Sequence, residues 1–164
     1  MNKKAPDPEK LKMRMASLCA RSEQCVYDIS LKLRRAGLNS QETESIIKFL
    51  IDNRFLSDER FAVHFASYKT RFSGWGRYKI QQALKAKRIN SSLIQKAVEE
   101  IDPKDSEEAL SRAIANKAKS LDLSKKEDAM KLYRHLMGRG FESDRVLPEI
   151  KSLIKKARSS QSDD

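Results

Sequence analysis

The stretch Phe61–Val98, FAVHFASYKTRFSGWGRYKIQQALKAKRINSSLIQKAV, decides how this chain is organised. It contains no aspartate or glutamate, and its basic residues are Lys69, Arg71, Arg77, Lys79, Lys85, Lys87, Arg88 and Lys96. Aromatic residues are interleaved with these charges. Such a mixture suits either a surface that binds phosphate and stacks on bases, or a pair of helices with a packed inner face and a wetted outer face.

Helical spacing separates these two uses. The aromatic residues follow one another at intervals of four, three and four along a helix opened by Ser57 and Asp58: Phe61, Phe65, Tyr68 and Phe72. This spacing predicts a core stripe rather than a base-stacking surface. A turn over 73–76 then ends the helix. Trp75 in that turn is interpreted as either a buried cover on the core or an exposed contact residue, and burial is favoured because large aromatics are usually mostly buried.

A second helix, predicted over 77–87, carries the main candidate binding site. Its outward face aligns residues at intervals of four, four and three: Arg77, Gln81, Lys85 and Arg88. No acidic residue is expected to neutralise this column. Lys69 and Arg71, beside the glycine turn, complete the candidate site, and the alternative is an ordinary solvated face.

Composition limits the classes of protein. The chain has 164 residues, a net charge of +11 and a pI near 9.7, which favour a polyanionic or acidic partner. Five glycines, four prolines and the lack of period-two alternation predict an all-α protein. No apolar run is long enough for a membrane span, so we expect a cytoplasmic protein without membrane association.

Reactive side chains are few. Cys19 and Cys25 are the only cysteines, and His64 and His135 are the only histidines. Their spacing fits no structural zinc site, and no nucleophile and base pair or paired carboxylates are recognisable. We therefore expect no catalytic, cofactor or metal site, and no enzyme activity.

The chain also repeats itself. Aligning the helix stops at Gly37, Arg88 and Gly140 brings Leu33, Leu84 and Leu136 into one register. Three tandem three-helix repeats are predicted over 10–56, 57–102 and 103–157, forming an elongated, curved body. A flexible arm over 1–9 and a disordered tail over 158–164 are expected at the ends.

Local signals predict where individual helices begin. Asn39 with Glu42 has the form of a capping box, and Asn90 and Ser91 are expected to cap the helix that follows them. Further caps are predicted at Ser22, at Asp105 and at Ser124 with Glu127, the last pair as a second capping box. Pro148 predicts a kink in the closing helix or a later start for it.

The middle stretch and its flanks resemble the RecX family of recombination regulators. The residues that carry the resemblance are Phe55-Leu56-Ser57-Asp58-Glu59-Arg60-Phe61-Ala62, then Gly74 and Gly76 before Arg77, Ile80, Leu84 and Ile89. Lys32-Leu33 with Ala36-Gly37-Leu38, and Leu136 with Arg139-Gly140-Phe141, resemble that family's first and third units. Ser57 stands where the pattern often has Asp, and Arg88 where the middle unit usually has Gly.

The resemblance implies three tandem three-helix units and a regulatory function. The chain would modulate, usually inhibit, the RecA recombinase by docking in the groove of its filament on single-stranded DNA, and act as a monomer. A sequence-independent nucleic-acid-binding protein is the alternative. Basic residues in corresponding stretches of the first and third repeats either extend this basic track or form an ordinary solvated surface: Lys32, Arg34, Arg35, Arg134 and Arg139.

Overall fold

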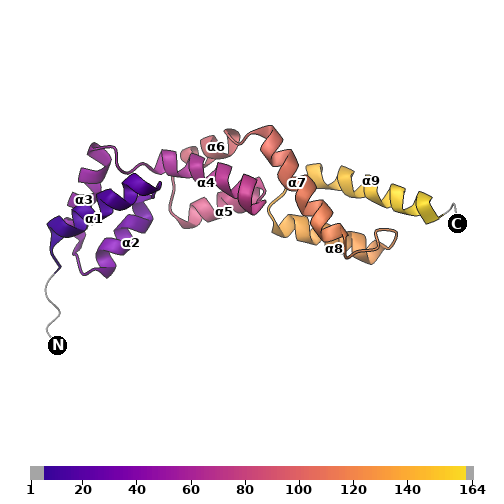
Figure 1. Ribbon diagram of the computed structural model, residues 1–164, viewed down its shortest axis with the longest axis horizontal. Helices are drawn as coiled ribbons and strands as arrows, with labels where there is room; N and C mark the ends of the chain where they lie inside the picture. The colour runs from indigo at the N-terminus through magenta and orange to yellow at the C-terminus, as the bar shows by residue number, and fades with distance from the viewer. Residues whose placement is uncertain (1–5, 162–164) are drawn as a thin grey trace, which may run out of the picture. The chain divides into compact units, whose positions relative to one another are not determined.

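The computed structural model describes residues 6–161, and residues 1–5 and 162–164 of the predicted arm and tail lie outside this part. Within it the chain forms nine α-helices and no strand, so the all-α prediction is confirmed (Figure 1). The helices are α1 (Pro8–Arg21), α2 (Val26–Arg35), α3 (Ser40–Asp52), α4 (Asp58–Ser73), α5 (Arg77–Ala86), α6 (Ser91–Glu99), α7 (Pro103–Ala118), α8 (Lys126–Gly138) and α9 (Ser143–Gln161).

The chain divides into two compact units. Unit 1 consists of Met1–His64 with Leu84–Ala97, and unit 2 consists of Phe65–Ala83 with Val98–Asp164. Each predicted repeat contains three helices, but the residues of the middle repeat, 57–102, contribute to both units. The predicted arm overlaps the first residues of α1, and the predicted tail begins inside α9.

The same turn closes the middle helix of each predicted repeat. After α2, α5 and α8, one residue adopts a left-handed backbone: Gly37 at φ 102°, Arg88 at φ 56° and Gly140 at φ 88°. The next amide donates to a carbonyl five residues earlier, from Leu38 to Leu33, Ile89 to Leu84 and Phe141 to Leu136, each at 3.2 Å. This is the Schellman arrangement, which satisfies carbonyls at the end of a helix. The three leucines that the sequence aligned, Leu33, Leu84 and Leu136, are therefore the acceptors of three equivalent hydrogen bonds.

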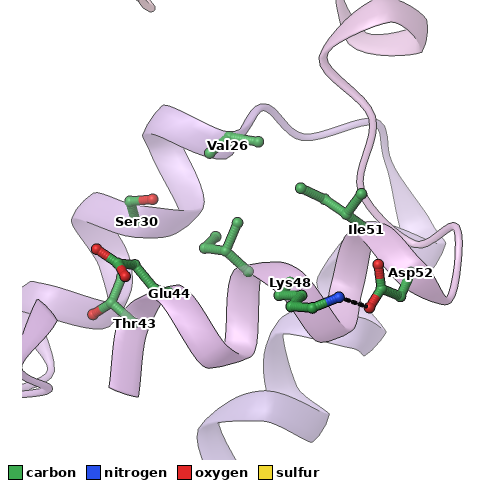
Figure 2. Close-up of a pocket in the computed structure, with 8 residues that line it drawn as sticks. Val26, Ser30, Thr43, Glu44, Lys48, Ile51 and Asp52 are labelled. Carbon is green, nitrogen blue, oxygen red and sulfur yellow. Dashed lines mark hydrogen bonds and ion pairs between the residues drawn. The ribbon is translucent and has the colours of Figure 1, made fainter. Parts of the chain in front are cut away.

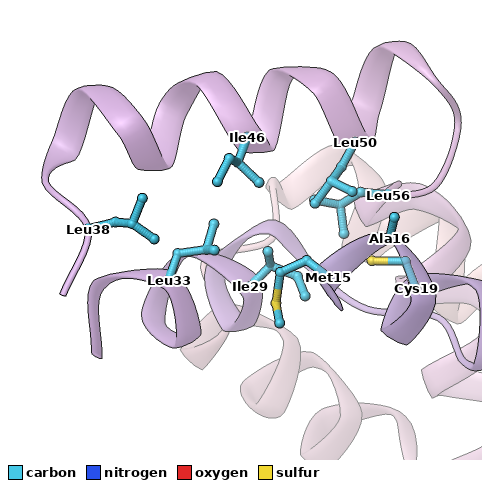
Figure 3. Close-up of a cluster of buried hydrophobic side chains, with 9 residues drawn as sticks. All are labelled: Met15, Ala16, Cys19, Ile29, Leu33, Leu38, Ile46, Leu50 and Leu56. Carbon is cyan, nitrogen blue, oxygen red and sulfur yellow. The ribbon is translucent and has the colours of Figure 1, made fainter. Parts of the chain in front are cut away.

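The core of unit 1 lies among α1, α2 and α3. Ile29, Leu33 and Leu50 are fully buried, and α3 packs against both α1 and α2. Figure 3 shows the buried cluster, which consists of Met15, Ala16, Cys19, Ile29, Leu33, Leu38, Ile46, Leu50 and Leu56. Each fully buried leucine or isoleucine contributes about 1.5–3 kcal/mol relative to an exposed one.

The core of unit 2 lies among α7, α8 and α9, with α8 packed against both of the others. Its buried cluster consists of Ala109, Leu110, Ile114, Ala129, Leu132, Leu136, Phe141, Val146 and Ile150. α9 begins at Ser143, so Pro148 lies inside it and the later start offered for this helix is wrong.

The aromatic stripe predicted on α4 is only partly buried. Phe61 is buried, but Tyr68 and Phe72 are 49% and 69% exposed. The buried positions on this helix include three small side chains, Ala62, Ala66 and Thr70. Ala62 and Ala66 each follow an aromatic residue by one position, which turns them by about 100° around the helix axis, and Thr70 follows Tyr68 by two positions. The spacing of four and three was correct for a helix, but it did not identify which face is buried.

Two of the predicted caps are confirmed and three are wrong. The Asn39 and Glu42 box is present, and the Asn90 side chain accepts from the amide of Ser92 at 2.9 Å. Three helices begin elsewhere than predicted, because α2 is preceded by Cys25 rather than Ser22, α7 by Asp102 rather than Asp105, and α8 by Lys125 rather than Ser124.

At the starts of α2 and α7, other carboxylates accept the hydrogen bonds of the first backbone amides. The first amide of α2, that of Val26, donates to the Asp58 carboxylate at 2.8 Å within unit 1. The Asp102 carboxylate accepts from the amide of Lys104 at 2.8 Å. Ser124 instead donates its hydroxyl to Asp122 at 2.6 Å.

Two turns of unit 2 touch through their backbones at Gly76 and Gly140. The Gly76 amide donates to the Arg139 carbonyl at 2.8 Å, and the Tyr78 amide donates to the Gly140 carbonyl at 3.0 Å. A Cβ on Gly76 would lie 2.3 Å from the Gly140 carbonyl. Only glycine permits this approach, because backbone atoms cannot move aside as a flexible side chain can.

Replacing Gly76 with alanine should therefore lower the free energy of unfolding by about 1–3 kcal/mol or more, as overpacking does. Gly138→Ala is the matched control, since a Cβ on Gly138 meets no atom within 4 Å. We expect the control to leave stability unchanged or to raise it by up to about 1 kcal/mol. Chemical denaturation of both variants checks this, and equal stability of the two would contradict the close contact.

Candidate functional site

The predicted binding residues are distributed over both units. The boundary falls within α5, so Arg77 and Gln81 belong to unit 2, and Lys85 and Arg88 belong to unit 1.

In unit 2 two basic residues of the predicted site, Arg71 and Arg77, have acidic partners. Arg71 forms an ion pair with Asp105 at 3.5 Å, and Arg77 forms one with Glu142 at 3.6 Å. The expectation that no acidic residue neutralises the column is therefore wrong for Arg77. These carboxylates come from α7 and from the residue before α9, far along the chain, so helical phasing within the middle stretch could not reveal them.

Arg139 has a structural contact in the same unit. Its guanidinium donates to the backbone carbonyls of Ser73 and Gly74, the second at 3.1 Å from Nη2 and 3.3 Å from Nε. These carbonyls end α4, where a helix leaves acceptors without intrahelical partners. Arg139 thus caps α4 from a distant part of the sequence. Arg134, by contrast, is exposed, and its Nε lies 3.5 Å from the Met130 carbonyl of its own helix.

Trp75 is half-buried and is the centre of a cationic cluster in unit 2. The Nζ atoms of Lys69 and Lys79 lie 4.6 Å and 4.7 Å from the centroid of its ring. Phe65 meets the indole edge-on, with ring centroids 6.2 Å apart. Cation–π contacts hold both ammonium groups at one place. Lys79 was missing from the predicted site because it does not lie in the phase of the column.

In unit 1 the predicted residues are exposed and have no ion pair within the part of the chain that the structure describes. They are Lys32, Arg34, Arg35, Lys85 and Arg88. Most lie in the last turns of α2 and α5, where the helix dipole favours positive charge by about 0.3–1 kcal/mol at exposed positions. The helix ends therefore tolerate these charges without acidic partners.

Two of these residues, Arg34 and Arg88, line one cavity of about 190 Å³. It is lined by Val26, Tyr27, Ser30, Arg34, Asp58, Lys87 and Arg88. The Arg88 guanidinium lies over the Tyr27 ring, 5.0 Å from its centroid. Lys87 is engaged in an ion pair with Asp28 at 2.6 Å. Arg34 of the first predicted repeat and Arg88 of the second thus meet at one site.

Asp58 is the acidic member of this cavity. Burial raises the pKa of its carboxyl above the ordinary value, the hydrogen bond from Val26 lowers the pKa, and the charge of Asp28 raises it again. The net effect is upward. The lining holds two arginines against this one carboxylate, and Lys87 is paired with Asp28, so the cavity keeps an excess of positive charge.

A second cavity of unit 1 is an apolar groove between α2 and α3, with a volume of about 320 Å³. Figure 2 shows it beside Val26 and Ile51, with the ion pair of Lys48 and Asp52 at one end. Because Lys48 is paired with Asp52, the groove offers little to attract an anionic ligand.

Nothing in the described residues indicates a reactive or metal-binding group. Cys19 and Cys25 are buried free thiols, and burial raises the pKa of Cys25 to about 11. A thiol with such a pKa stays protonated and unreactive near neutral pH. Within the same part of the chain no cluster of His, Cys, Asp or Glu is arranged to hold a metal ion. No helix there is long and apolar enough to cross a membrane.

Fold and surface define an all-helical protein that presents basic side chains without ion pairs among the described residues. A family model described as the second three-helix domain of RecX matches residues 57–98. The chain is 30% identical to the regulatory protein RecX of Vibrio campbellii over 129 residues, which cover 79% of this chain and 82% of that protein. It is 31% identical to the regulatory protein RecX of Clostridium tetani, over 83% of this chain and 60% of that one.

Solved structures show the same fold. A crystal structure of regulatory protein RecX matches with a TM-score of 0.78 and 22% identity, covering 88% of this chain and 73% of that one. The crystal structure of RecX from Lactobacillus salivarius matches with a TM-score of 0.75 and 19% identity, covering 93% and 99%. The chain belongs to the RecX family of regulatory proteins.

The contacts of Arg139 lead to a stability prediction. Arg139→Gln should lower the free energy of unfolding by about 1–3 kcal/mol, because the carbonyls of Ser73 and Gly74 lose a charged donor. Arg134→Gln removes the same charge from an exposed position of α8 and should change stability by less than about 0.5 kcal/mol. Urea denaturation monitored by circular dichroism measures both. A neutral effect at Arg139 would show that its side chain is not needed for the turn.

Proposed function

We propose that this chain regulates the RecA recombinase, and inhibits it, by docking along the groove of the RecA filament on single-stranded DNA. Through this contact it would affect homologous recombination and DNA repair. The protein would act in the cytoplasm, as a monomer. Membership of the RecX family supports a regulatory function, and the resemblance of the sequence motifs supports RecA as the partner.

The observation that carries the docking proposal is the set of exposed basic residues in unit 1 that form no ion pair with any residue of the described range 6–161. Residues that already have carboxylate partners, such as Arg71 and Arg77, gain less from a new anion because the existing pair must first be broken. Lys85 and Arg88 carry no such cost. We therefore place the docking face on the end of α5 and the end of α2 rather than along the whole predicted column.

A second candidate function is binding to nucleic acid without the recombinase. The cluster of Lys69, Trp75 and Lys79 favours it, because two ammonium groups beside an indole match a phosphate next to a base. A gel shift on single-stranded DNA, with and without the recombinase and ATP, separates the two functions. Tight, salt-sensitive binding without the recombinase and no effect on its ATPase would favour the second.

Reversing Lys85 and Arg88 to glutamate together should weaken binding to the RecA filament by about tenfold or more, since each exposed cation would become a repelling anion. If the two residues contact phosphates of the single-stranded DNA, the slope of log K against log salt should also fall by about 0.7 for each lost contact. Filament binding by fluorescence anisotropy across a salt series measures both effects.

The matched control is the double variant Lys151→Glu, Lys155→Glu on α9, which changes the net charge equally at two exposed positions. It should bind almost as the parent protein does. A thermal melt checks that both variants are folded. If the folded Lys85, Arg88 variant binds the filament as the parent does, this face is not the docking face. If both variants lose affinity equally, the loss reflects net charge and not the position of the residues.

A further inference from the structure

We propose that the unit 1 cavity between Arg34 and Arg88 is a receptor for one carboxylate side chain, an aspartate or glutamate presented by a protein partner. The cavity is lined by both arginines, by the hydroxyl-bearing Tyr27 and Ser30, and by Val26. This inference deepens the proposed function, since it names what a protein partner would present, but it does not depend on which protein presents it.

The donors of the cavity are suitable for a carboxylate. Neither Arg34 nor Arg88 has an ion pair within the described residues, and the described structure gives the hydroxyls of Tyr27 and Ser30 no hydrogen bond. A guanidinium binds a carboxylate through two parallel N–H donors, and charge-assisted bonds of this kind are among the stronger ones in proteins. The Tyr27 ring fixes the Arg88 guanidinium through the contact at 5.0 Å, which reduces the ordering needed on binding.

The backbone of Arg88 is a second, independent observation. The residues at the equivalent helix ends, Gly37 and Gly140, are glycines with positive φ, whereas Arg88 adopts φ 56° with a full side chain. A non-glycine residue in this conformation is strained, and such strain is found preferentially at functional sites. The turn would form more easily with glycine at residue 88, so stability does not account for the arginine. Its guanidinium over Tyr27 and beside the cavity supplies a reason.

The same cavity is less suited to a nucleic-acid backbone. Asp58 forms part of its wall, and Asp28 lies beside Lys87, so a chain of phosphates would bring several negative charges toward two carboxylates. A single carboxylate avoids most of this repulsion. At about 190 Å³ the concave site also has room for one small side-chain group rather than for an extended backbone.

The test is an NMR titration of the full chain with the peptide acetyl-Ala-Glu-Ala-amide, which carries a single carboxylate. We expect saturable shifts of the Arg88 and Arg34 Nε–Hε signals and of the Tyr27 ring. Arg88→Gly and Arg34→Gln should each weaken binding by about tenfold, because a charged donor is lost. Arg88→Gly should at the same time keep or raise the melting temperature, since glycine relieves the strained turn.

Two further variants sharpen the test. Arg35→Gln is the matched control, because Arg35 is exposed on the same helix, next to Arg34, but does not line the cavity. It should change the affinity by less than about twofold. Asp58→Asn keeps an oxygen for the Val26 amide and removes the repelling charge, so it should bind the peptide about two- to fivefold more tightly.

A parallel titration with dodecathymidylate gives the opposing outcome. If the oligonucleotide shifts the cavity signals and the peptide does not, the cavity is a phosphate site and the proposal is wrong. Equal losses for Arg34→Gln and Arg35→Gln, or no saturable shift with either probe, would also overturn it. Because no recombinase is present, a negative result here leaves the proposed regulation of RecA intact, and a failure of that function leaves peptide binding intact.

Discussion

A left-handed residue at the end of the middle helix of each predicted repeat is the constraint on which the rest of the structure depends. At Gly37, Arg88 and Gly140 the chain reverses its twist, and the following amide returns to a carbonyl five residues back. This places a buried apolar residue directly after each turn, and the third helix of the repeat follows from it. Without the turn the middle helix would continue, and the apolar faces would not meet.

Much of this arrangement is local, and the sequence therefore predicts it. The register of Leu33, Leu84 and Leu136 identified side chains that are all fully buried, and the hydrogen bond that closes each of these helices spans only five residues. The Asn39 and Glu42 box is equally local, since each of its two bonds joins residues three apart in sequence. Features of this kind need no knowledge of the tertiary structure.

The candidate site was less predictable because its chemistry depends on distant residues. Arg139 resembled a docking residue by register, yet its guanidinium caps α4, more than sixty residues earlier in the chain. Arg77 resembled a free cation in the sequence, but in the structure it forms an ion pair with Glu142. Arg54, at φ 61°, occupies another left-handed turn, and this turn has no glycine by which the sequence would predict it. In each case the deciding contact is long-range or backbone-determined, and residue spacing carries no information about it.

Ion pairing therefore separates the basic residues into two classes with different consequences. Paired cations such as Arg71 and Arg77 contribute to the structure of unit 2 and are partly neutralised, so they add little to the field felt by a partner. The cations at the ends of α2 and α5, which have no ion pair in the described part of the chain, keep their full charge, and the helix dipoles stabilise them. Arg88 has a structural role and an exposed charge at once. Its backbone forms the turn on which the middle repeat depends, and its guanidinium lines the same cavity as Arg34. A charged residue with a strained backbone indicates a particular position on the surface as a binding site. The net charge of the whole chain carries no such information about position.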